Sequence, residues 1–142
     1  MRLYKLTDAQ HQTYGGLQWA AGVTHRAAPG PPVLCTRTVL HAYRSAEEAV
    51  VFNPIHAAFP APILWEAEAP KILVEDGLKL GVRELTTLRI VPAPQFTLNQ
   101  LVRFAIYTVP ASFQNEAWRT WAAAWLRKDP AARVAQAARA AA

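Results

Sequence analysis

The sequence predicts an α+β fold in which an antiparallel or mixed sheet is covered by a short central helix and by C-terminal helices. Three observations predict this class. Strand-like segments fill most of residues 1–91, one short helix interrupts them, and helical periodicity begins only after Pro94. We therefore expect residues 1–110 to form a core domain, and residues 111–142 to form a basic, Trp-bearing helical extension packed on it.

Composition supports a folded domain with an acidic partner. Of the 142 residues, 52% are hydrophobic and 18% are charged, which excludes a disordered chain and allows a real core. The net charge of +5 favours binding to an acidic protein surface, or to nucleic acid. A single cysteine, Cys35, excludes an internal disulfide and fits a reducing compartment. No segment resembles a signal peptide or a membrane span, so we expect a soluble cytoplasmic protein that does not bind membranes.

The stretch 39–68 is the centre of the predicted fold. Residues 39–43 alternate as an extended chain does. Ser45 then supplies an N-cap and Glu48 completes a capping box, so a helix is expected to begin at Ala46.

The strands on either side follow from alternation and from glycine and proline. The pair Asn53-Pro54 is expected to end or kink the central helix, because the residue before proline is pushed out of the helical region. Residues 63–68 alternate as a strand with one wetter face, and residues 2–7 form the first strand. Within 13–19, the pair Gly15-Gly16 predicts a bulge or a tight hairpin.

The remaining β-rich segments have clear turn signals. Prolines and a glycine mark an exposed loop at 29–32, and residues 33–38 are expected to be extended. A strand at 71–75 is followed by the hairpin signal Asp76-Gly77. Further strands are expected within 78–91, with Gly81 as a bulge.

Two helices are predicted near the C-terminal end. Thr97 and Gln100 form a second capping box, and Pro110 is expected to end the helix that begins there. A second helix is predicted over Gln114–Lys128. The Ala-rich segment 131–142 offers almost no large side chain for packing.

The second of these helices carries the strongest candidate for a binding surface. Trp118, Trp121 and Trp125 are spaced by three and four residues and share one side of the helix. They either anchor the helix to the sheet, which is the simpler interpretation, or contribute to a protein-binding surface. Residues 111–142 hold +3 of the net charge of +5. The candidate partner-binding residues are Trp118, Arg119, Trp121, Trp125, Arg127, Lys128, Arg133 and Arg139.

The other chemically interesting residues carry weaker signals. Zinc ligand pairs are two to four residues apart, and no such pair is present, so we predict no metal site. The residues considered for this role are His25, Cys35, His41 and His56.

Two carboxylates on one strand are the remaining candidates for catalysis. Glu66 and Glu68 share a strand face and form a possible acid/base pair, although a solvated strand face is the simpler interpretation. Cys35 lies in a strand-like run and is expected to be buried. We assign no catalytic residue and no cofactor.

Five phrases of the sequence carry a resemblance: LYKLTD at Leu3, TYGGLQW at Thr13, LHAYRSAEEAV at Leu40, NPIHA at Asn53 and LWEAEA at Leu64. Together they resemble a family of small proteins of unknown function from bacteriophages and bacterial genomes. The resemblance implies a viral or mobile-element setting, in which small basic proteins often inhibit host machinery. We therefore expect a non-enzymatic interaction protein that binds an acidic surface of host machinery, with bacterial RNA polymerase as the first candidate.

A second resemblance gives an enzymatic alternative. A first strand, a later strand leading into a Ser-started helix and a following Glu-bearing strand are similar in outline to ADP-ribosyltransferases. Those enzymes place His or Arg on the first strand, where this chain has Lys5. The resemblance implies that Glu66 or Glu68 is catalytic. It predicts a pocket lined by Tyr4, His41, Tyr43 and one of these carboxylates. Nucleic-acid binding is the third alternative.

Overall fold

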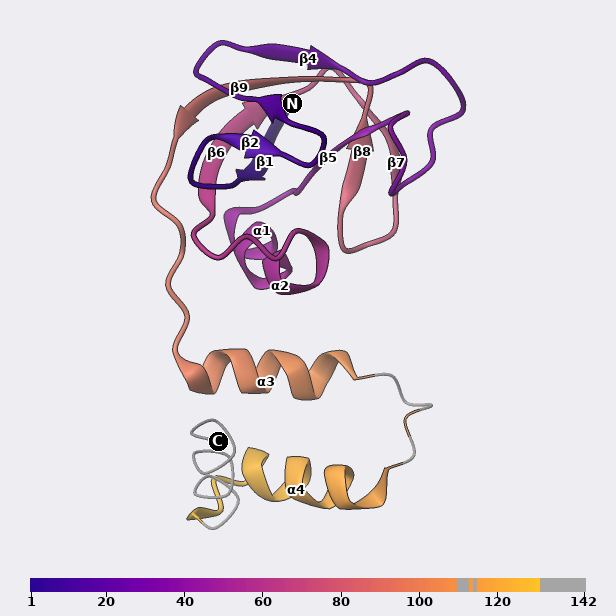
Figure 1. Ribbon diagram of the computed structural model, residues 1–142. Coiled ribbons are helices and arrows are strands. Elements are labelled where there is room, and N and C mark those ends of the chain that lie inside the picture. Colours follow the sequence, from indigo (N-terminus) through magenta and orange to yellow (C-terminus); the bar gives the residue numbers. More distant parts are fainter. Residues whose placement is uncertain (110–112, 114, 131–142) are drawn as a thin grey trace. The chain divides into compact units, whose positions relative to one another are not determined.

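The computed structural model describes residues 1–109, 113 and 115–130. The chain divides into two compact units, Met1–Gln95 and Phe96–Ala142 (Figure 1). The first unit contains all the strands of the described chain and two short helices, and the second contains two longer helices. The predicted α+β class is confirmed.

The strands of the first unit pair antiparallel in three sheets (Figure 1). The largest sheet consists, in spatial order, of β1 (Arg2–Thr7), β6 (Ile63–Glu68), β9 (Glu84–Ile90) and β4 (Thr24–Arg26). A second sheet consists of β5 (Leu40–Ala42), β8 (Leu80–Val82) and β7 (Ile72–Glu75). The predicted tight hairpin is formed by β2 (Gln12–Thr13) and β3 (Leu17–Gln18).

The two larger sheets share one hydrophobic core. An isolated bridge joins Tyr4 of β1 to Tyr43, directly after β5, with backbone hydrogen bonds of 2.9 Å in both directions. The bridge brings the start of the chain against its middle. The buried core cluster draws on both sheets and consists of Leu3, Trp19, Ala42, Ala67, Ala69, Leu80, Val82 and Leu85.

Gly81 allows close packing inside the second sheet. A Cβ at this position would lie 2.8 Å from the Cβ of Val39 and 2.9 Å from a methyl of Val74. The irregular register that we predicted at Gly81 falls in the facing strand, between Ile72 and Val74. Glycine is therefore required at this position, because any side chain would collide with Val39 and Val74.

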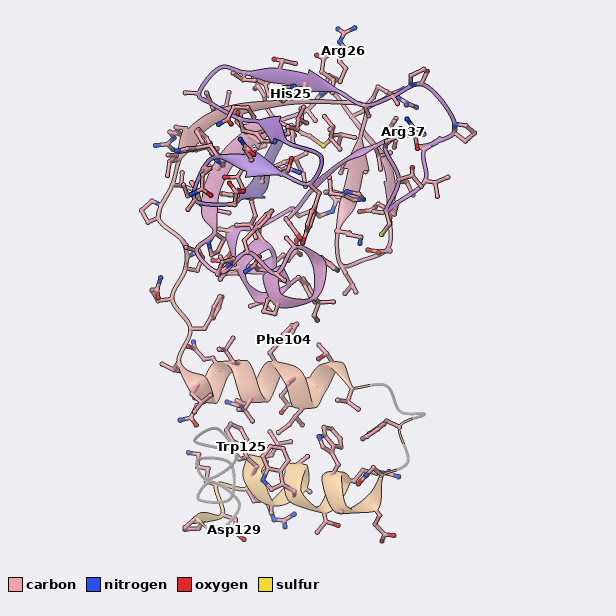
Figure 2. The ribbon with its side chains drawn as sticks, in the orientation of Figure 1. His25, Arg26, Arg37, Phe104, Trp125 and Asp129 are labelled. Atoms are coloured by element: carbon pink, nitrogen blue, oxygen red, sulfur yellow. The ribbon has the colours of Figure 1, made fainter. Side chains whose placement is uncertain are left out.

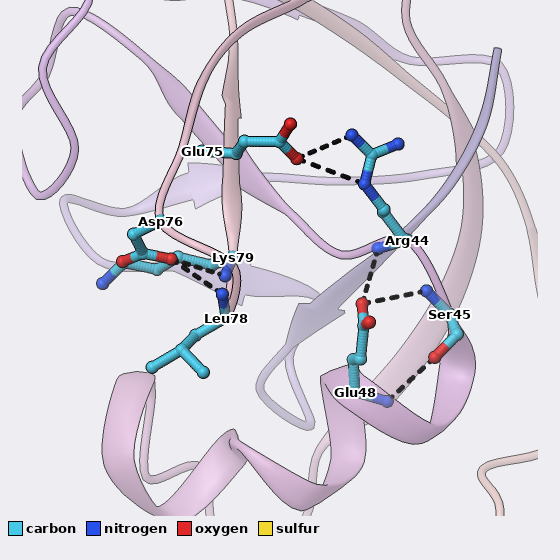
Figure 3. Close-up of polar contacts among 7 residues, drawn as sticks. All are labelled: Arg44, Ser45, Glu48, Glu75, Asp76, Leu78 and Lys79. Atoms are coloured by element: carbon cyan, nitrogen blue, oxygen red, sulfur yellow. Dashed lines mark hydrogen bonds and ion pairs between the residues drawn. The ribbon is translucent and has the colours of Figure 1, made fainter.

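The central helix α1 (Ala46–Val51) begins as predicted and packs against β1 and β6. The Ser45 hydroxyl accepts from the Glu48 amide at 3.1 Å, and the Glu48 carboxylate accepts from the amides of Ser45 and Arg44 (Figure 3). The Arg44 side chain is in turn paired with Glu75 at 2.6 Å, which links the helix start to β7.

The helix breaks next to Asn53-Pro54, as predicted. The break lies one residue earlier, at Phe52, and Pro54 lies in the first turn of a new helix, α2 (Asn53–His56). Proline is favoured there because the first amides of a helix have no intrahelical partner. The pair therefore also starts a second short helix.

Residues 33–38 are not extended, contrary to the prediction. They form successive turns, and Cys35 is exposed with a φ of 63°. The Thr36 hydroxyl donates to the Val33 carbonyl at 2.8 Å, and the Thr38 hydroxyl accepts from the Val33 amide at 3.3 Å. Local bonds from threonine hydroxyls thus replace strand pairing. The expectation that Cys35 is buried is wrong for the same reason.

The second unit contains α3 (Leu98–Thr108) and α4 (Glu116–Leu126). The capping box of Thr97 and Gln100 is confirmed, and Asn115 caps α4 by accepting from the Trp118 amide at 2.8 Å. Helix α3, which we assigned to the core domain, falls in this unit. The predictions for Pro110, Ala111 and residues 131–142 lie outside the described residues. No helix in the described ranges is long and apolar enough to cross a membrane.

Candidate functional site

The first unit contains a pocket with a volume of about 730 Å³. This size is typical of sites for small ligands. Its wall consists of residues from β1, the β2–β3 hairpin, the segment 26–41, the end of α2 and the turn before β8. These segments are far apart in sequence, and the bridge between Tyr4 and Tyr43 helps to bring them together.

The described lining of the pocket is basic and contains no Asp or Glu. Four cationic side chains belong to it, together with His41, His56, Tyr14 and Tyr43. Arg26 is neutralised by Glu84 at 2.6 Å and extends from β4 into solvent (Figure 2). The four cationic residues are Lys5, Arg26, Arg37 and Lys79.

Lys5 is the buried cation of the pocket, with 8% of its surface exposed. Its Nζ donates to the His41 carbonyl at 2.8 Å and lies 5.4 Å from the centre of the Trp19 ring. Among the described residues no carboxylate pairs with it. Burial lowers the pKa of Lys5 from 10.5 to about 8, because a charged amine loses its hydration there.

His41 is held as a neutral imidazole. Its Nε2 accepts from the Cys35 amide at 2.9 Å, so the ring proton must be on Nδ1. Burial, and then the charges of Lys5 and Lys79, lower the pKa of His41 from 6.5 to about 4. At neutral pH the ring is therefore uncharged and fixes the exposed turn that carries Cys35.

Tyr43 and His56 form a second polar pair in the lining. The Tyr43 hydroxyl lies 3.1 Å from His56 Nδ1, and the two rings are stacked. Burial, and then the charge of Asp76, raise the pKa of Tyr43 to about 12, so the hydroxyl stays protonated. Burial, and then the charge of Lys79, lower the pKa of His56. The pair is therefore neutral and holds a proton that it can share.

Aromatic and cationic side chains form a further part of the lining. The Tyr14 hydroxyl donates to the Ala57 carbonyl at 2.6 Å, and its ring stacks on Phe59. Lys79 donates to Cys35 Sγ at 3.0 Å. The Lys79 amide itself is held by the Asp76 carboxylate at 2.9 Å (Figure 3).

Arg83 stabilises the irregular segment that contributes to the pocket wall. Its guanidinium donates to the carbonyls of Ala28 at 2.6 Å, Thr38 at 2.9 Å and Gly30 at 2.8 Å. One side chain thus fixes both ends of the segment that carries Arg37 and Cys35. Sequence analysis did not identify this arginine, because its three acceptors are backbone carbonyls, which leave no residue pattern in the sequence.

Half of the residues that the enzymatic alternative predicts for its pocket line the observed pocket. His41 and Tyr43 line it, but Tyr4, Glu66 and Glu68 do not. The register pairs Tyr4 with Glu66 and Lys5 with Trp65, and residues directly opposite each other point to the same face. Glu66 therefore lies on the face opposite Lys5.

On that face Glu66 is already paired. Its carboxylate lies 2.9 Å from the Nε of Arg2 and 2.7 Å from a guanidinium nitrogen of Arg89. No described carboxylate lines the pocket, so the carboxylate that a transferase would need there is not found among the described residues. The residues that could bind a metal ion form no cluster within the described chain.

The predicted partner-binding residues are found in different environments. Trp118 and Trp121 are half-buried on α4, and the three cations around them are exposed. Trp125 of α4 is only 2% exposed, which fits the anchoring interpretation for this one of the three tryptophans (Figure 2). The exposed cations are Arg119, Arg127 and Lys128. Arg133 and Arg139 lie outside the described residues.

The pocket contains candidate residues that sequence analysis did not assign to it, namely Lys5, Arg37 and Lys79. A signal was present in β1, where Leu3, Lys5 and Thr7 share one face and the two neighbours of the lysine are suited to a core. Comparison of the chain with protein-family models, with curated proteins and with solved structures finds no match. The interpretation of the site therefore depends on its geometry.

Proposed function

We propose that the first unit binds a small anionic ligand in its pocket. The observation that carries the proposal is the buried ammonium of Lys5, which no described carboxylate compensates. An uncompensated charge inside a protein is costly unless a counter-charge offsets it. A bound anion supplies that counter-charge.

The other lining residues support the same ligand class. Arg37 and Lys79 add positive charge to the lining and attract anions towards the pocket. The rings of Tyr14 and Tyr43 offer apolar faces to the body of a ligand. We therefore propose a phosphorylated or carboxylated molecule with a flat or apolar part.

Calorimetric titration of the full chain tests this proposal, with inorganic phosphate, pyrophosphate, AMP and NAD as probes. We expect at least one probe to bind, and Lys5→Met to weaken it about tenfold or more, as the loss of a charge-assisted bond does. The matched control is Lys71→Met, because Lys71 is exposed and does not line the pocket. Equal affinity of the Lys5 variant and the wild type would contradict the proposal.

We propose a second function for the second unit, as a bacteriophage-type protein that binds host machinery. Helix α4 and the two residues after it carry three exposed cations, Arg119, Arg127 and Lys128, which we call the α4 cations. Trp118 and Trp121 of the same helix are half-buried. Arg and Trp are frequent in the centres of protein interfaces. The expected partner is an acidic surface of bacterial RNA polymerase, and the expected effect is inhibition of transcription in the host cytoplasm.

Direct binding to purified bacterial RNA polymerase tests the second proposal. Neutralising the three α4 cations with glutamine should weaken binding, whereas neutralising Arg103 and Lys71 should not. A salt-dependent mobility shift with DNA measures the nucleic-acid alternative in parallel. Binding that is unchanged by loss of the α4 cations would remove this proposal and leave the pocket proposal intact.

A further inference from the structure

We propose that Lys5 forms an imine with the carbonyl group of a small anionic aldehyde or 2-oxo acid bound in the pocket. This inference rests on the proposed function, because the cationic lining is what holds the anionic end of such a ligand. It adds a covalent step that anion binding alone does not require.

The surroundings of Lys5 are those of a nucleophilic amine. Among the described residues, the Nζ of Lys5 donates to the His41 carbonyl, which accepts one N–H and leaves the lone pair of the neutral amine free. The amine is buried, lines the pocket and has no carboxylate partner among the described residues. Desolvation and neighbouring cations are the usual means by which proteins activate lysine for addition to carbonyl groups.

The lowered pKa of Lys5, about 8, agrees with this geometry. At neutral pH roughly a tenth of the side chain is the free amine, compared with far less than a hundredth for an ordinary lysine. The imidazole ring of His41 stays uncharged at this pH, so it adds no positive charge next to the amine of Lys5.

The step balances without an oxidant or a reductant. The Nζ lone pair forms a bond to the carbonyl carbon, and the π electrons of the C=O bond move to oxygen. Transfer of one proton from nitrogen to that oxygen gives a carbinolamine. The hydroxyl then leaves as water with a second proton, and the C=N bond forms.

The Tyr43–His56 pair is placed to assist the proton transfers. Both side chains line the same pocket, and the Tyr43 hydroxyl is protonated and hydrogen-bonded to an imidazole that accepts protons. General acid–base groups of this kind assist both the addition and the loss of water. The anionic group of the ligand would lie near Lys79 or Arg37, the lining cations other than Lys5 itself and the paired Arg26.

Reductive trapping tests the inference on the full chain. Glyoxylate and pyruvate are the anionic probes, acetaldehyde is the uncharged probe, and cyanoborohydride converts any imine to a stable secondary amine. The chain has four lysines, Lys5, Lys71, Lys79 and Lys128, so peptide mass mapping assigns each adduct. We expect Lys5 to be trapped about tenfold or more faster than Lys71 at pH 7.5, with the anionic probes favoured.

Variants separate the chemistry from folding. Lys5→Arg should remove the fast adduct, and Lys79→Gln should reduce the preference for glyoxylate over acetaldehyde. Trapping of wild-type Lys5 no faster than Lys71 would overturn the inference, and this comparison needs no variant. If anion binding persists in that case, the proposed function stands without the imine. If neither binding nor fast trapping is found, both fall.

Discussion

At the scale of single residues, Lys5 determines how the stability of the first unit depends on pH. An unfolded chain holds the lysine proton up to about pH 10.5, whereas the folded chain loses it near pH 8. Between these values unfolding takes up a proton, so the folded state gains stability as the pH rises. Below pH 8 the full cost of the buried charge remains.

We predict that Lys5→Met raises the free energy of unfolding by about 1–3 kcal/mol at pH 7, because the buried charge is removed. The gain should shrink between pH 8 and pH 10.5, where the wild-type lysine becomes neutral. Urea denaturation at pH 7 and pH 10 measures both values, with Lys71→Met as the control. A gain that does not change with pH would mean that packing, and not charge, is responsible.

His41 gives a second residue-scale prediction. Its folded pKa of about 4, against 6.5 in the unfolded chain, means that stability is lost as the pH falls through this range. Protonation of Nε2 would also break the bond from the Cys35 amide. We therefore expect the NMR signals of the His41 ring and of the Cys35 amide to change together, with a midpoint near pH 4. A ring that titrates near pH 6.5 would contradict the buried, neutral imidazole.

At the scale of elements, the irregular segment 28–38 depends on Arg83. Three backbone carbonyls accept from its guanidinium, and no strand pairing replaces these bonds. We predict that Arg83→Gln lowers the free energy of unfolding by about 1–3 kcal/mol, as the loss of partly buried charge-assisted bonds does. Amide exchange at Ala28, which donates to the Arg37 carbonyl, should accelerate.

Arg89→Gln is the matched control for this change. Arg89 is exposed and pairs with Glu66 on the face of the sheet opposite Lys5. Its loss should therefore leave amide exchange in 28–38 unaltered. If both variants accelerate exchange equally, Arg83 has no special role in holding the segment. Ligand affinity should fall with Arg83→Gln only, because this segment carries Arg37 of the pocket.

The elements also show how far sequence alone could predict this fold. Capping boxes at Ser45 and Thr97 were predictable, because each is completed within four residues. The turns of 33–38 were not, because Val33 suits a strand, and the bonds that hold the turns come from threonine hydroxyls and from Arg83, far along the chain. His41 and Tyr43 were predicted to line a pocket, but the places of Lys5 and Lys79 in it were not, because these two residues meet only after the sheets have formed.

At the scale of the whole molecule, the two proposed functions belong to different units. Every described lining residue of the pocket lies between Lys5 and Lys79, and the α4 cations lie beyond Gln95. From the sequence we placed the boundary at 110, where a proline is expected to end a helix. Contacts place it at Gln95, within the proline-rich stretch that follows β9.

We predict that a chain ending at Gln95 folds by itself and keeps the ligand affinity of the full chain. The residues of the hydrophobic core cluster all belong to the first unit. Every described lining residue of the pocket belongs to the first unit as well. Circular dichroism and calorimetric titration of this shorter chain test the prediction, and binding to RNA polymerase should be lost at the same time. A shortened chain that is unfolded would show that the first unit needs residues beyond Gln95. One that is folded but has lost the ligand would mean that the second unit completes the site, and one that still binds the polymerase would place that surface in the first unit.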